Sequence, residues 1–384
     1  MNNKQSIIVG MVIMAMSAFA AAPQVKNVKA MQQYPWGKVY ISYEVEGDIA
    51  ASAGSGPTPE LFLTAKDKAT GKLYVEVGAG SSWLTGDVGT ASGLHHVVWD
   101  IGAQGMAINS ANVVFTVAYR NGMYLVIDLS GGANASTYPM SYLDAVPSGG
   151  WTDEYKTTKL VLRRLPAGTF KMQNSSDVTL TKPFYMGVFE VTQRQYELVT
   201  GTNPCSSSLY GKGNTYPVHY VSYNTIRGSS NGAKWPSSSA VDSSSFMGKL
   251  RARTGLDFDL PTEAQWEYAC RSETTTTYYW GNSMNGNYAW YTDNSGDKTH
   301  PVGGKTPNAW GLYDMSGNVW EWCLDWYDTL SYGTDPKGSS SGVSRVKRGG
   351  SWYDVANFCT SSRRNYDNPS GEYNSRGFRL VRTL

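Results

Sequence analysis

Cysteine is the residue type with the widest chemistry in this sequence, and all four cysteines follow residue 200: Cys205, Cys270, Cys323 and Cys359. A thiolate can act as a nucleophile, bind a soft metal ion or oxidise to a disulfide. In an oxidising compartment four cysteines pair in any of three ways, and spacing leaves the choice open. Because no cysteine precedes residue 200, the first half must be stabilised by its own hydrophobic core.

Two further patterns could carry chemistry, and both are weak. His95 and His96 are adjacent, so on a strand they point to opposite faces and cannot bind the same metal ion. We therefore expect both to be strand-surface residues. Residues 338–342 read Gly-Ser-Ser-Ser-Gly, which formally fits a nucleophile elbow. They lie in a serine run with no strand before it and no helix after it, so we expect no catalytic serine there.

The N-terminus predicts the compartment. Lys4 precedes an apolar run over residues 7–20, followed by Ala-Ala-Pro. This run is too short to span a bilayer and ends in small residues, which is typical of a secretory signal peptide. We expect residues 1–22 to be removed and the protein to be exported, to the periplasm or the cell exterior, with no membrane span after cleavage.

Charge excludes two classes of partner. The formal net charge is +2, and no run of Lys or Arg is present. Nucleic acid and anionic membranes are therefore not expected as partners. Aromatic residues reach 13% and glycines number 41, whereas charged residues are only 17%. This composition predicts a loop-rich fold and disfavours a helical bundle.

The order of the elements predicts two domains. Residues 23–129 contain short runs with period-two alternation, which predict an all-β sandwich of the immunoglobulin or fibronectin type, acting as a spacer or adhesive unit. The runs lie at residues 38–45, 61–65, 73–77, 96–99, 113–119 and 124–128. Residues 130–158 are rich in Gly, Pro, Ser and Thr and predict a linker whose aromatic residues can pack onto one domain.

Residues 159–384 contain few regular elements. We expect one helix over residues 242–253, opened by Asp and Ser, and one over residues 261–271. Thr262 is its expected N-cap, and Gln265 three residues later completes a capping box. The overall fold class is therefore α+β, with much irregular backbone in the second half.

Seven blocks of this second half resemble the sulfatase-modifying-factor family, which includes the formylglycine-generating enzymes. The most specific are residues 260–271, Leu-Pro-Thr-Glu-Ala-Gln-Trp-Glu-Tyr-Ala-Cys-Arg, and residues 311–322, Gly-Leu-Tyr-Asp-Met-Ser-Gly-Asn-Val-Trp-Glu-Trp. The others are at residues 165–172, 185–192, 217–223, 348–352 and 377–380. The resemblance covers residues 159–384 and implies a C-type-lectin-like fold.

The family resemblance implies a test for catalysis. The family's copper-dependent oxidases hold a cuprous ion with two cysteines, whose positions here are Asp354 and Cys359. A carboxylate is a hard ligand and a poor substitute, so copper is not expected. Ser351 matches a serine that takes part in catalysis in the oxidase. Cys359 and Ser351 are therefore the candidate catalytic residues. The iron-dependent branch needs two histidines and a glutamate at a spacing that this sequence lacks.

The same resemblance bears on the disulfides. It places Cys323 near Cys359, and this pair is the disulfide candidate. The family bridge to Cys270 cannot form, because its partner position is Arg364.

Calcium is the expected cofactor. One family calcium loop matches residues 314–321, which gives Asp314, Gly317, Val319 and Glu321 as ligands through side-chain and backbone oxygens. A second family loop is not expected to bind, because Trp290 stands where an oxygen ligand is required.

Two functions remain open. The first is a non-catalytic recognition module for a protein or glycan ligand, since the terminal block is rich in Tyr, Asn and Asp, a composition found in adaptable binding surfaces. Its expected recognition residues are Trp352, Tyr353, Asp354, Asn357, Tyr366 and Tyr373. Variable proteins diversified by retroelements share this fold. The alternative is an oxidase that converts a protein cysteine to formylglycine through Cys359, alone or with Cys323.

Overall fold

The computed structural model describes residues 24–33, 37–47, 60–68, 73–78, 84–102, 113–120 and 122–384. The predicted signal peptide lies outside these residues. The chain forms two compact units. The first comprises Met1–Met123, Ser136–Ala145 and Thr254–Leu256, and the second comprises Tyr124–Ala135, Val146–Arg253 and Asp257–Leu384.

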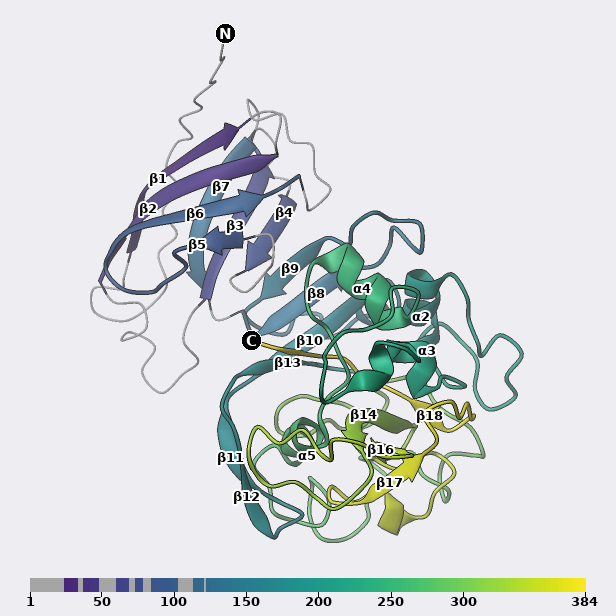
Figure 1. The fold of residues 1–384 in the computed structure, drawn as a ribbon. Helices are drawn as coiled ribbons and strands as arrows, with labels where there is room; N and C mark the ends of the chain where they lie inside the picture. Colours follow the sequence, from purple (N-terminus) through teal and green to yellow (C-terminus); the bar gives the residue numbers. More distant parts are fainter. Residues whose placement is uncertain are drawn as a thin grey trace. The chain divides into compact units, whose positions relative to one another are not determined.

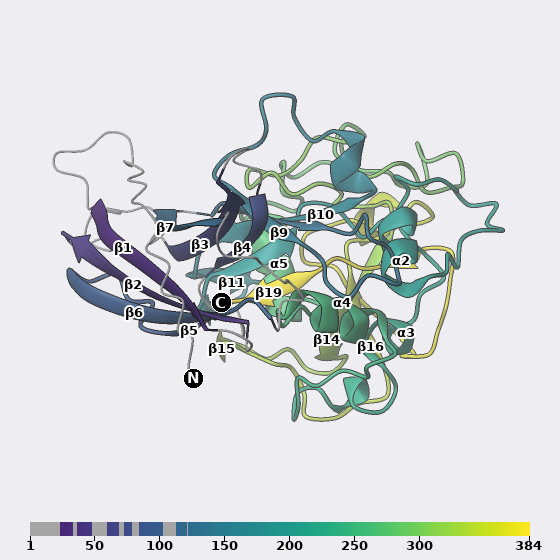
Figure 2. The same cartoon turned by 90° about the horizontal axis from the view of Figure 1, so that it is seen from above.

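The described part of the first unit consists of antiparallel strands. One sheet has the order β1-β2-β6-β5, and another has the order β4-β3-β7 (Figures 1 and 2). The strands are β1 (Gln24–Gln33), β2 (Lys38–Glu46), β3 (Glu60–Asp67), β4 (Leu73–Gly78), β5 (Leu84–Gly86), β6 (Gly93–Asp100) and β7 (Val113–Arg120). The all-β character follows from the period-two alternation, whereas the immunoglobulin or fibronectin type stays a prediction.

Aromatic side chains connect the two sheets of the first unit. The ring centroids of Trp99 and Phe115 are 6.2 Å apart. On β6, His95 is buried and His96 is exposed, which confirms that they face opposite sides. The expected surface position of His95 is wrong, because its Nδ1 lies 3.0 Å from Asp87 Oδ2 and its ring stacks on Tyr43.

The second unit begins earlier than the sequence boundary at residue 129. β8 (Tyr124–Asp128), expected in the sandwich, pairs with β10 (Lys159–Leu165) along five residues. With β13 (Phe184–Gly187) and β19 (Val381–Thr383) they follow the order β19-β13-β10-β8. The last strand of the chain therefore joins the first strands of this unit.

The predicted linker contains regular structure. β9 (Met140–Leu143) belongs to the first unit, and a short 3-10 helix covers Asp153–Lys156. Trp151 contacts Tyr124 and Tyr155, each with ring centroids 5.0 Å apart. The expectation that linker aromatics pack onto one unit is confirmed for Trp151.

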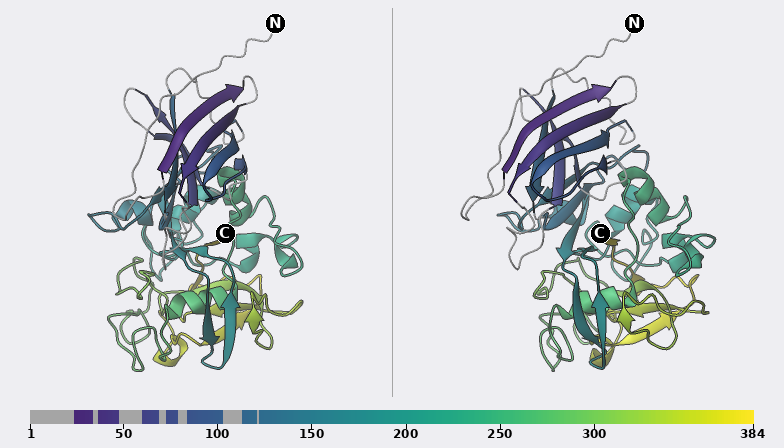
Figure 3. Two further views of the ribbon diagram at one scale, coloured as in Figure 1. Left: turned by 90° about the vertical axis from the view of Figure 1, so that its left-hand side faces the viewer. Right: turned by 60° about the vertical axis from the view of Figure 1, so that its left-hand side comes forward.

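Two smaller sheets complete the second unit. One has the order β17-β16-β14-β18, from β14 (Trp320–Trp326), β16 (Arg345–Arg348), β17 (Arg364–Asp367) and β18 (Arg376–Gly377). The other pairs the hairpin β11 (Gly168–Met172) and β12 (Ser176–Leu180), seen as long adjacent arrows in Figure 3, with β15 (Gly333–Thr334). Long irregular segments connect them, as the composition predicts.

The four described α-helices are short: α2 (Gln193–Thr200), α3 (Tyr223–Arg227), α4 (Phe246–Thr254) and α5 (Glu263–Arg271). The capping box of α5 is confirmed, because Thr262 Oγ1 accepts from Gln265 N and Gln265 Oε1 accepts from Thr262 N. α4 begins four residues after the expected Asp242. The carboxylate of Asp242 accepts backbone N–H bonds from Ser230 and Asn231 instead, and Ser245 Oγ accepts from Gly248 N.

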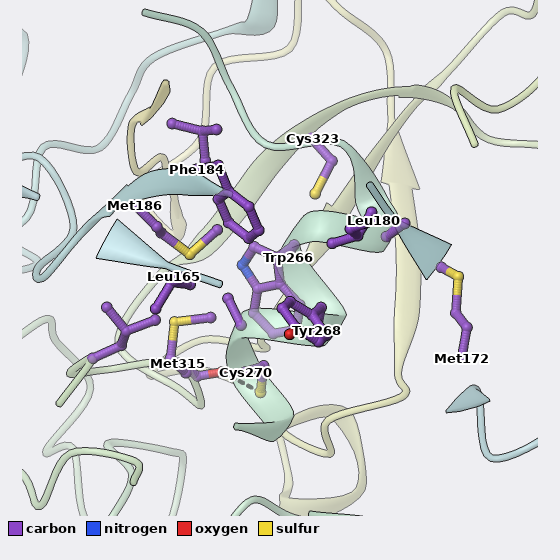
Figure 4. Packing of buried hydrophobic residues seen from close by; sticks show 14 of the residues in the cluster. Leu165, Met172, Leu180, Phe184, Met186, Trp266, Tyr268, Cys270, Met315 and Cys323 are labelled. Atoms are coloured by element: carbon purple, nitrogen blue, oxygen red, sulfur yellow. Dashed lines mark hydrogen bonds between the residues drawn. The ribbon is translucent and has the colours of Figure 1, made fainter. Parts of the chain in front are cut away.

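The main core of the second unit forms around α5. Figure 4 shows Trp266 surrounded by Phe184, Met186 and Leu180 from the strands. Cys270 and Cys323 also belong to this buried cluster. Trp266 is fully buried, and its Nε1 donates to Glu321 Oε2 at 2.7 Å. The core therefore fixes one carboxylate of the predicted calcium loop.

Candidate functional site

The Gly-Gly-Ser block follows β16 and places the candidate catalytic residues. Gly349 and Gly350 have φ values of +98° and +76°, a conformation that side chains disfavour. A Cβ atom on Gly350 would lie 2.7 Å from Cys359 Sγ. Glycine is therefore needed for the close approach of the thiol to this turn.

Asp354 is the residue that the family resemblance puts in place of a copper cysteine, and its carboxylate is already bonded. Asp354 Oδ2 accepts from Trp320 Nε1 at 2.8 Å and from the Ser351 hydroxyl. The backbone also holds the turn, since Asp354 N donates to Ser351 O and Thr292 N donates to Asp354 O. Ser351 is fully buried and donates its hydroxyl hydrogen bond to the Asp354 carboxylate, so in this structure Ser351 stabilises the turn.

Cys359 is a buried thiol with no activating group. It has no exposed surface, and burial, followed by the negative charge of Asp354, raises the pKa of its thiol far above the usual value. A thiolate is required for nucleophilic attack and for binding cuprous copper. The paired Asp354 carboxylate and the neutral Cys359 thiol do not fit a two-thiolate copper centre.

The expected disulfide between Cys323 and Cys359 is not formed, because all four cysteines are free and buried. Cys323 belongs to the core cluster beside α5, whereas Cys359 lies against Gly350. Cys205 is held by backbone contacts, with Sγ 3.1 Å from His219 O and 3.2 Å from His219 N. Arg364, which replaces the family partner of Cys270, forms a bidentate ion pair with Glu263.

The predicted calcium residues are close together but engaged in other contacts. Both oxygens of Glu321 accept from Arg379, at 2.6 and 2.7 Å. Asp314 Oδ2 accepts from Gly303 N at 2.6 Å. Within the described residues no group of three or more His, Cys, Asp or Glu side chains is placed to hold a metal ion. The donor set as arranged does not fit calcium, because Glu321 would first have to release Arg379.

Glu190 is a buried acid that sequence reasoning missed. Its carboxylate accepts from Asn318 Nδ2 at 2.7 Å and from Val319 N at 3.1 Å, so it holds the loop that was expected to bind calcium. Burial and the charges of Asp314 and Glu321 raise its pKa. Burial also raises the pKa of Asp314 to about 6. Glu190 belongs to the block Phe-Glu-Val-Thr at residues 189–192, and nothing in that block indicates a hydrogen bond with Asn318, which lies 128 positions later in the sequence.

Trp290, which stands where the second family calcium loop would need an oxygen ligand, contacts two other side chains. The His300 ring stacks on it, with centroids 3.7 Å apart and planes within 13°. Lys305 Nζ lies 3.5 Å from its ring centroid. A side-chain ammonium therefore lies against the ring at this loop, which is a cation–π contact.

Some of the expected recognition residues are exposed, and the others are buried or bonded to neighbouring side chains. Tyr353, Asn357, Tyr366 and Tyr373 are exposed, as a binding surface requires. Trp352 is buried, and the carboxylate of Asp354 contacts Trp320 and Ser351, so both are corrected to supporting roles.

Sequence reasoning missed Leu209 and Tyr210, which lie in a distant loop. The Tyr210 ring stacks on Trp352, with centroids 5.4 Å apart. Only the tertiary fold brings this loop to the terminal block.

The core, the Gly-Gly-Ser turn and the short helices define the second unit as a domain of the C-type-lectin-like class found in formylglycine-generating enzymes. The model of the sulfatase-modifying factor enzyme 1-like domain matches residues 152–384. The chain therefore belongs to this family, which confirms the resemblance.

Several relatives agree with this assignment. The formylglycine-generating enzyme of Mus musculus is 36% identical over 143 residues, which cover 32% of this chain and 38% of that enzyme. The Streptomyces coelicolor enzyme is 35% identical, with 46% of its length covered. The chain thus spans less than half of these enzymes. The chaperone protein LppX of Paenibacillus barcinonensis is 30% identical over 257 residues, which cover 56% of this chain and 87% of that protein.

Two solved structures each match more than half of this chain. Treponema denticola variable protein 1 is 27% identical with a TM-score of 0.49, covering 59% of this chain and 96% of that one. PvdO from Pseudomonas aeruginosa is 27% identical with a TM-score of 0.46, covering 58% and 94%. Among the described residues, none of the helices has the length and hydrophobicity that a membrane crossing requires.

Proposed function

We propose that this chain is an exported recognition protein that uses the formylglycine-generating scaffold without its catalysis. One observation carries the proposal: the carboxylate of Asp354, the residue that the family resemblance puts in place of the first copper cysteine, is bonded to Ser351 and Trp320. The remaining thiol, Cys359, is buried and neutral. A copper centre of the oxidase type therefore lacks both a ligand and an ionised partner.

A relative outside the oxidases supports a binding role. LppX, whose name describes a chaperone, has 87% of its length covered by this chain, whereas the formylglycine-generating enzymes have 38% to 48%. A chaperone acts by binding another polypeptide. The exposed tyrosines of the terminal block are suited to such contacts, because Tyr offers large contact area at low cost in conformational entropy.

A titration with cuprous copper tests this proposal. The wild-type protein is expected to bind no stoichiometric copper in the presence of a competing chelator, and Cys359→Ser is expected to behave identically. Asp354→Cys is the matched positive control, because it restores the second sulfur beside Cys359. A parallel assay incubates the protein with copper, oxygen and a Cys-x-Pro-x-Arg peptide. Stoichiometric copper in the wild type with conversion of the peptide thiol to an aldehyde would establish the oxidase alternative.

Export is tested separately, by sequencing the N-terminus of the mature protein. Cleavage after residue 22 or a neighbouring alanine is expected. An intact N-terminus in a protein retained in the cytoplasm would contradict it.

A further inference from the structure

Five large apolar or aromatic side chains are exposed on loops of the second unit, and we call them the aromatic patch. Leu209 is 90% exposed, Tyr353 68%, Val355 52%, Tyr373 47% and Tyr210 37%. A single exposed apolar residue needs no explanation, whereas a cluster of them marks an interaction site. Three of the five, Leu209, Tyr210 and Val355, lie outside the recognition surface expected from the sequence.

Trp352 joins the loops that carry the aromatic patch. Tyr210 stacks on it with planes within 21°, and Tyr353 meets it at 72°, each with centroids 5.4 Å apart. Trp352 Nε1 donates to Asn374 O at 3.2 Å, which places residue 373 beside the same anchor. Its backbone N donates to Asn318 O, and its backbone O accepts from Ser295 Oγ. The patch therefore rests on a buried, fully bonded tryptophan.

The loop that carries Leu209 and Tyr210 is fixed before any ligand arrives. Tyr210 O accepts from both the N–H and the hydroxyl of Thr299. Ser208 Oγ accepts from Tyr210 N and lies 2.7 Å from His219 Nε2. Burial lowers the pKa of His219 to about 4, so the ring stays neutral at physiological pH. A preformed surface loses less conformational entropy on binding.

The charged groups near the aromatic patch are neutralised within the protein. Asp367 pairs with Lys347 at 3.2 Å and also with Arg376, and Arg376 in turn lies 3.6 Å from the Tyr373 ring centroid. The Asp354 carboxylate also interacts electrostatically with both Lys347 and Arg376, so two acids balance two bases. Next to the patch in sequence, the exposed side chains of Lys212 and Glu372 carry opposite charges. The patch thus presents no net charge, and it disfavours a charged ligand because the ligand would lose water without gaining a partner.

We infer that the aromatic patch binds an uncharged apolar segment of another polypeptide. This inference rests on the proposed recognition function and names its partner class. The aliphatic side chains of Leu209 and Val355 gain from contact with apolar side chains, whereas sugar hydroxyls placed against these two residues would find no hydrogen-bond partner. Aromatic anchors with a neutral centre are typical of protein interfaces.

The test uses the whole protein on an array of uncharged and charged decapeptides, and on an array of neutral glycans. Binding is expected to uncharged peptides rich in Leu, Ile, Phe and Val. For the strongest peptide, fluorescence anisotropy is expected to show at least a tenfold higher Kd, on the order of the loss of one interface hot spot, for Leu209→Ser combined with Tyr353→Ser. Tyr332→Ser, at a tyrosine 40% exposed in another loop, is the matched control and should leave Kd unchanged. Circular dichroism confirms that each variant is folded.

Salt gives a second readout. Between low and high salt the Kd should change less than about twofold, because no charge pair is screened. An empty peptide array, preference for charged peptides, a Kd unaffected in the double variant, or glycan binding lost in that variant would each overturn the inference. The copper titration is independent of these outcomes. A blank array with no copper binding leaves the non-catalytic proposal intact, and copper binding alone refutes that proposal without touching the patch.

Discussion

Asp325 is a buried carboxylate whose ionisation should contribute to the pH dependence of stability in the second unit. It lies on β14 and accepts from Glu263 N at 2.7 Å, at the first turn of α5. Burial, followed by the negative charge of Glu263, raises the pKa of Asp325 from 3.8 to about 7. The perturbation is Asp325→Asn, which removes the charge and keeps an oxygen that can accept the Glu263 N–H.

The magnitude follows from this pKa. The pKa of Asp325 is higher by about 3 in the folded protein, and each whole pKa step is worth roughly 1.4 kcal/mol, so ionising this carboxyl lowers the free energy of unfolding by about 4 kcal/mol. The folded protein binds the proton more tightly than the unfolded chain, in which the carboxyl titrates near pH 4. The free energy of unfolding of the wild type therefore falls as pH rises from 4 to 7, and the loss is complete above pH 7. Asn does not titrate, so the variant escapes this loss.

Chemical and thermal unfolding at pH 5 and pH 8 measure the effect. Tryptophan fluorescence follows the second unit, because 10 of the 13 tryptophans follow residue 150. At pH 5 the variant should already be about 1.6 kcal/mol more stable than the wild type, because the carboxyl of the unfolded chain has lost its proton at that pH whereas the folded protein keeps it. At pH 8 it should be about 4 kcal/mol more stable, which raises Tm by roughly 8 to 16 °C. Asp257→Asn, at an exposed position, is the control. A variant less stable at pH 8, or a difference independent of pH, would refute the reasoning.

Four further predictions follow from the same contacts. Because all four thiols are buried and free, none should react rapidly with Ellman's reagent in the native state and all four should react in denaturant; two unreactive sulfurs would reveal a disulfide. Arg379→Met leaves Glu321 buried without its partner and should lower the free energy of unfolding by about 3 to 5 kcal/mol, whereas exposed Lys298→Met should have little effect; equal losses would contradict the buried pair. Replacing a chelator by millimolar calcium should change Tm by less than about 1 °C, because Arg379 occupies both oxygens of Glu321 and an ion that does not bind adds no stability; a rise of several degrees would show that Glu321 releases Arg379. Thr262→Ala should cost about 1 kcal/mol in urea unfolding through the lost N-cap of α5, and Thr262→Ser should restore it; no loss would mean that the capping box contributes nothing.

Patterns that act over a few residues could be predicted from the sequence. The capping box of Thr262 and Gln265 requires contacts only three positions apart, and the opposite faces of His95 and His96 follow from strand geometry alone. The start of α4 was misplaced for a long-range reason. Asp242 bonds to a loop 11 and 12 residues earlier, and this contact outcompetes its role as an N-cap.

Site residues were located by the family blocks, but their roles depended on distant partners. The family resemblance indicated that Asp354 replaces a cysteine, and the structure adds that Trp320 and Ser351 donate hydrogen bonds to its carboxylate. Glu321 matched a calcium loop, yet Arg379 binds both of its oxygens from 58 positions away. No local pattern contains such a pair, because each partner is placed by a separate strand or loop.

By itself the sequence determined the family, the all-β character of the first half and the lack of a second cysteine in the terminal block, because block order, alternation and residue identity are properties of the chain. Only the tertiary structure decided which side chains meet. It buried Trp352, stacked Tyr210 from a loop about 140 residues earlier onto it, and committed Glu321 to Arg379. The physical reason is that burial and ion pairing depend on distances in space, and these distances are set only when the whole chain has folded.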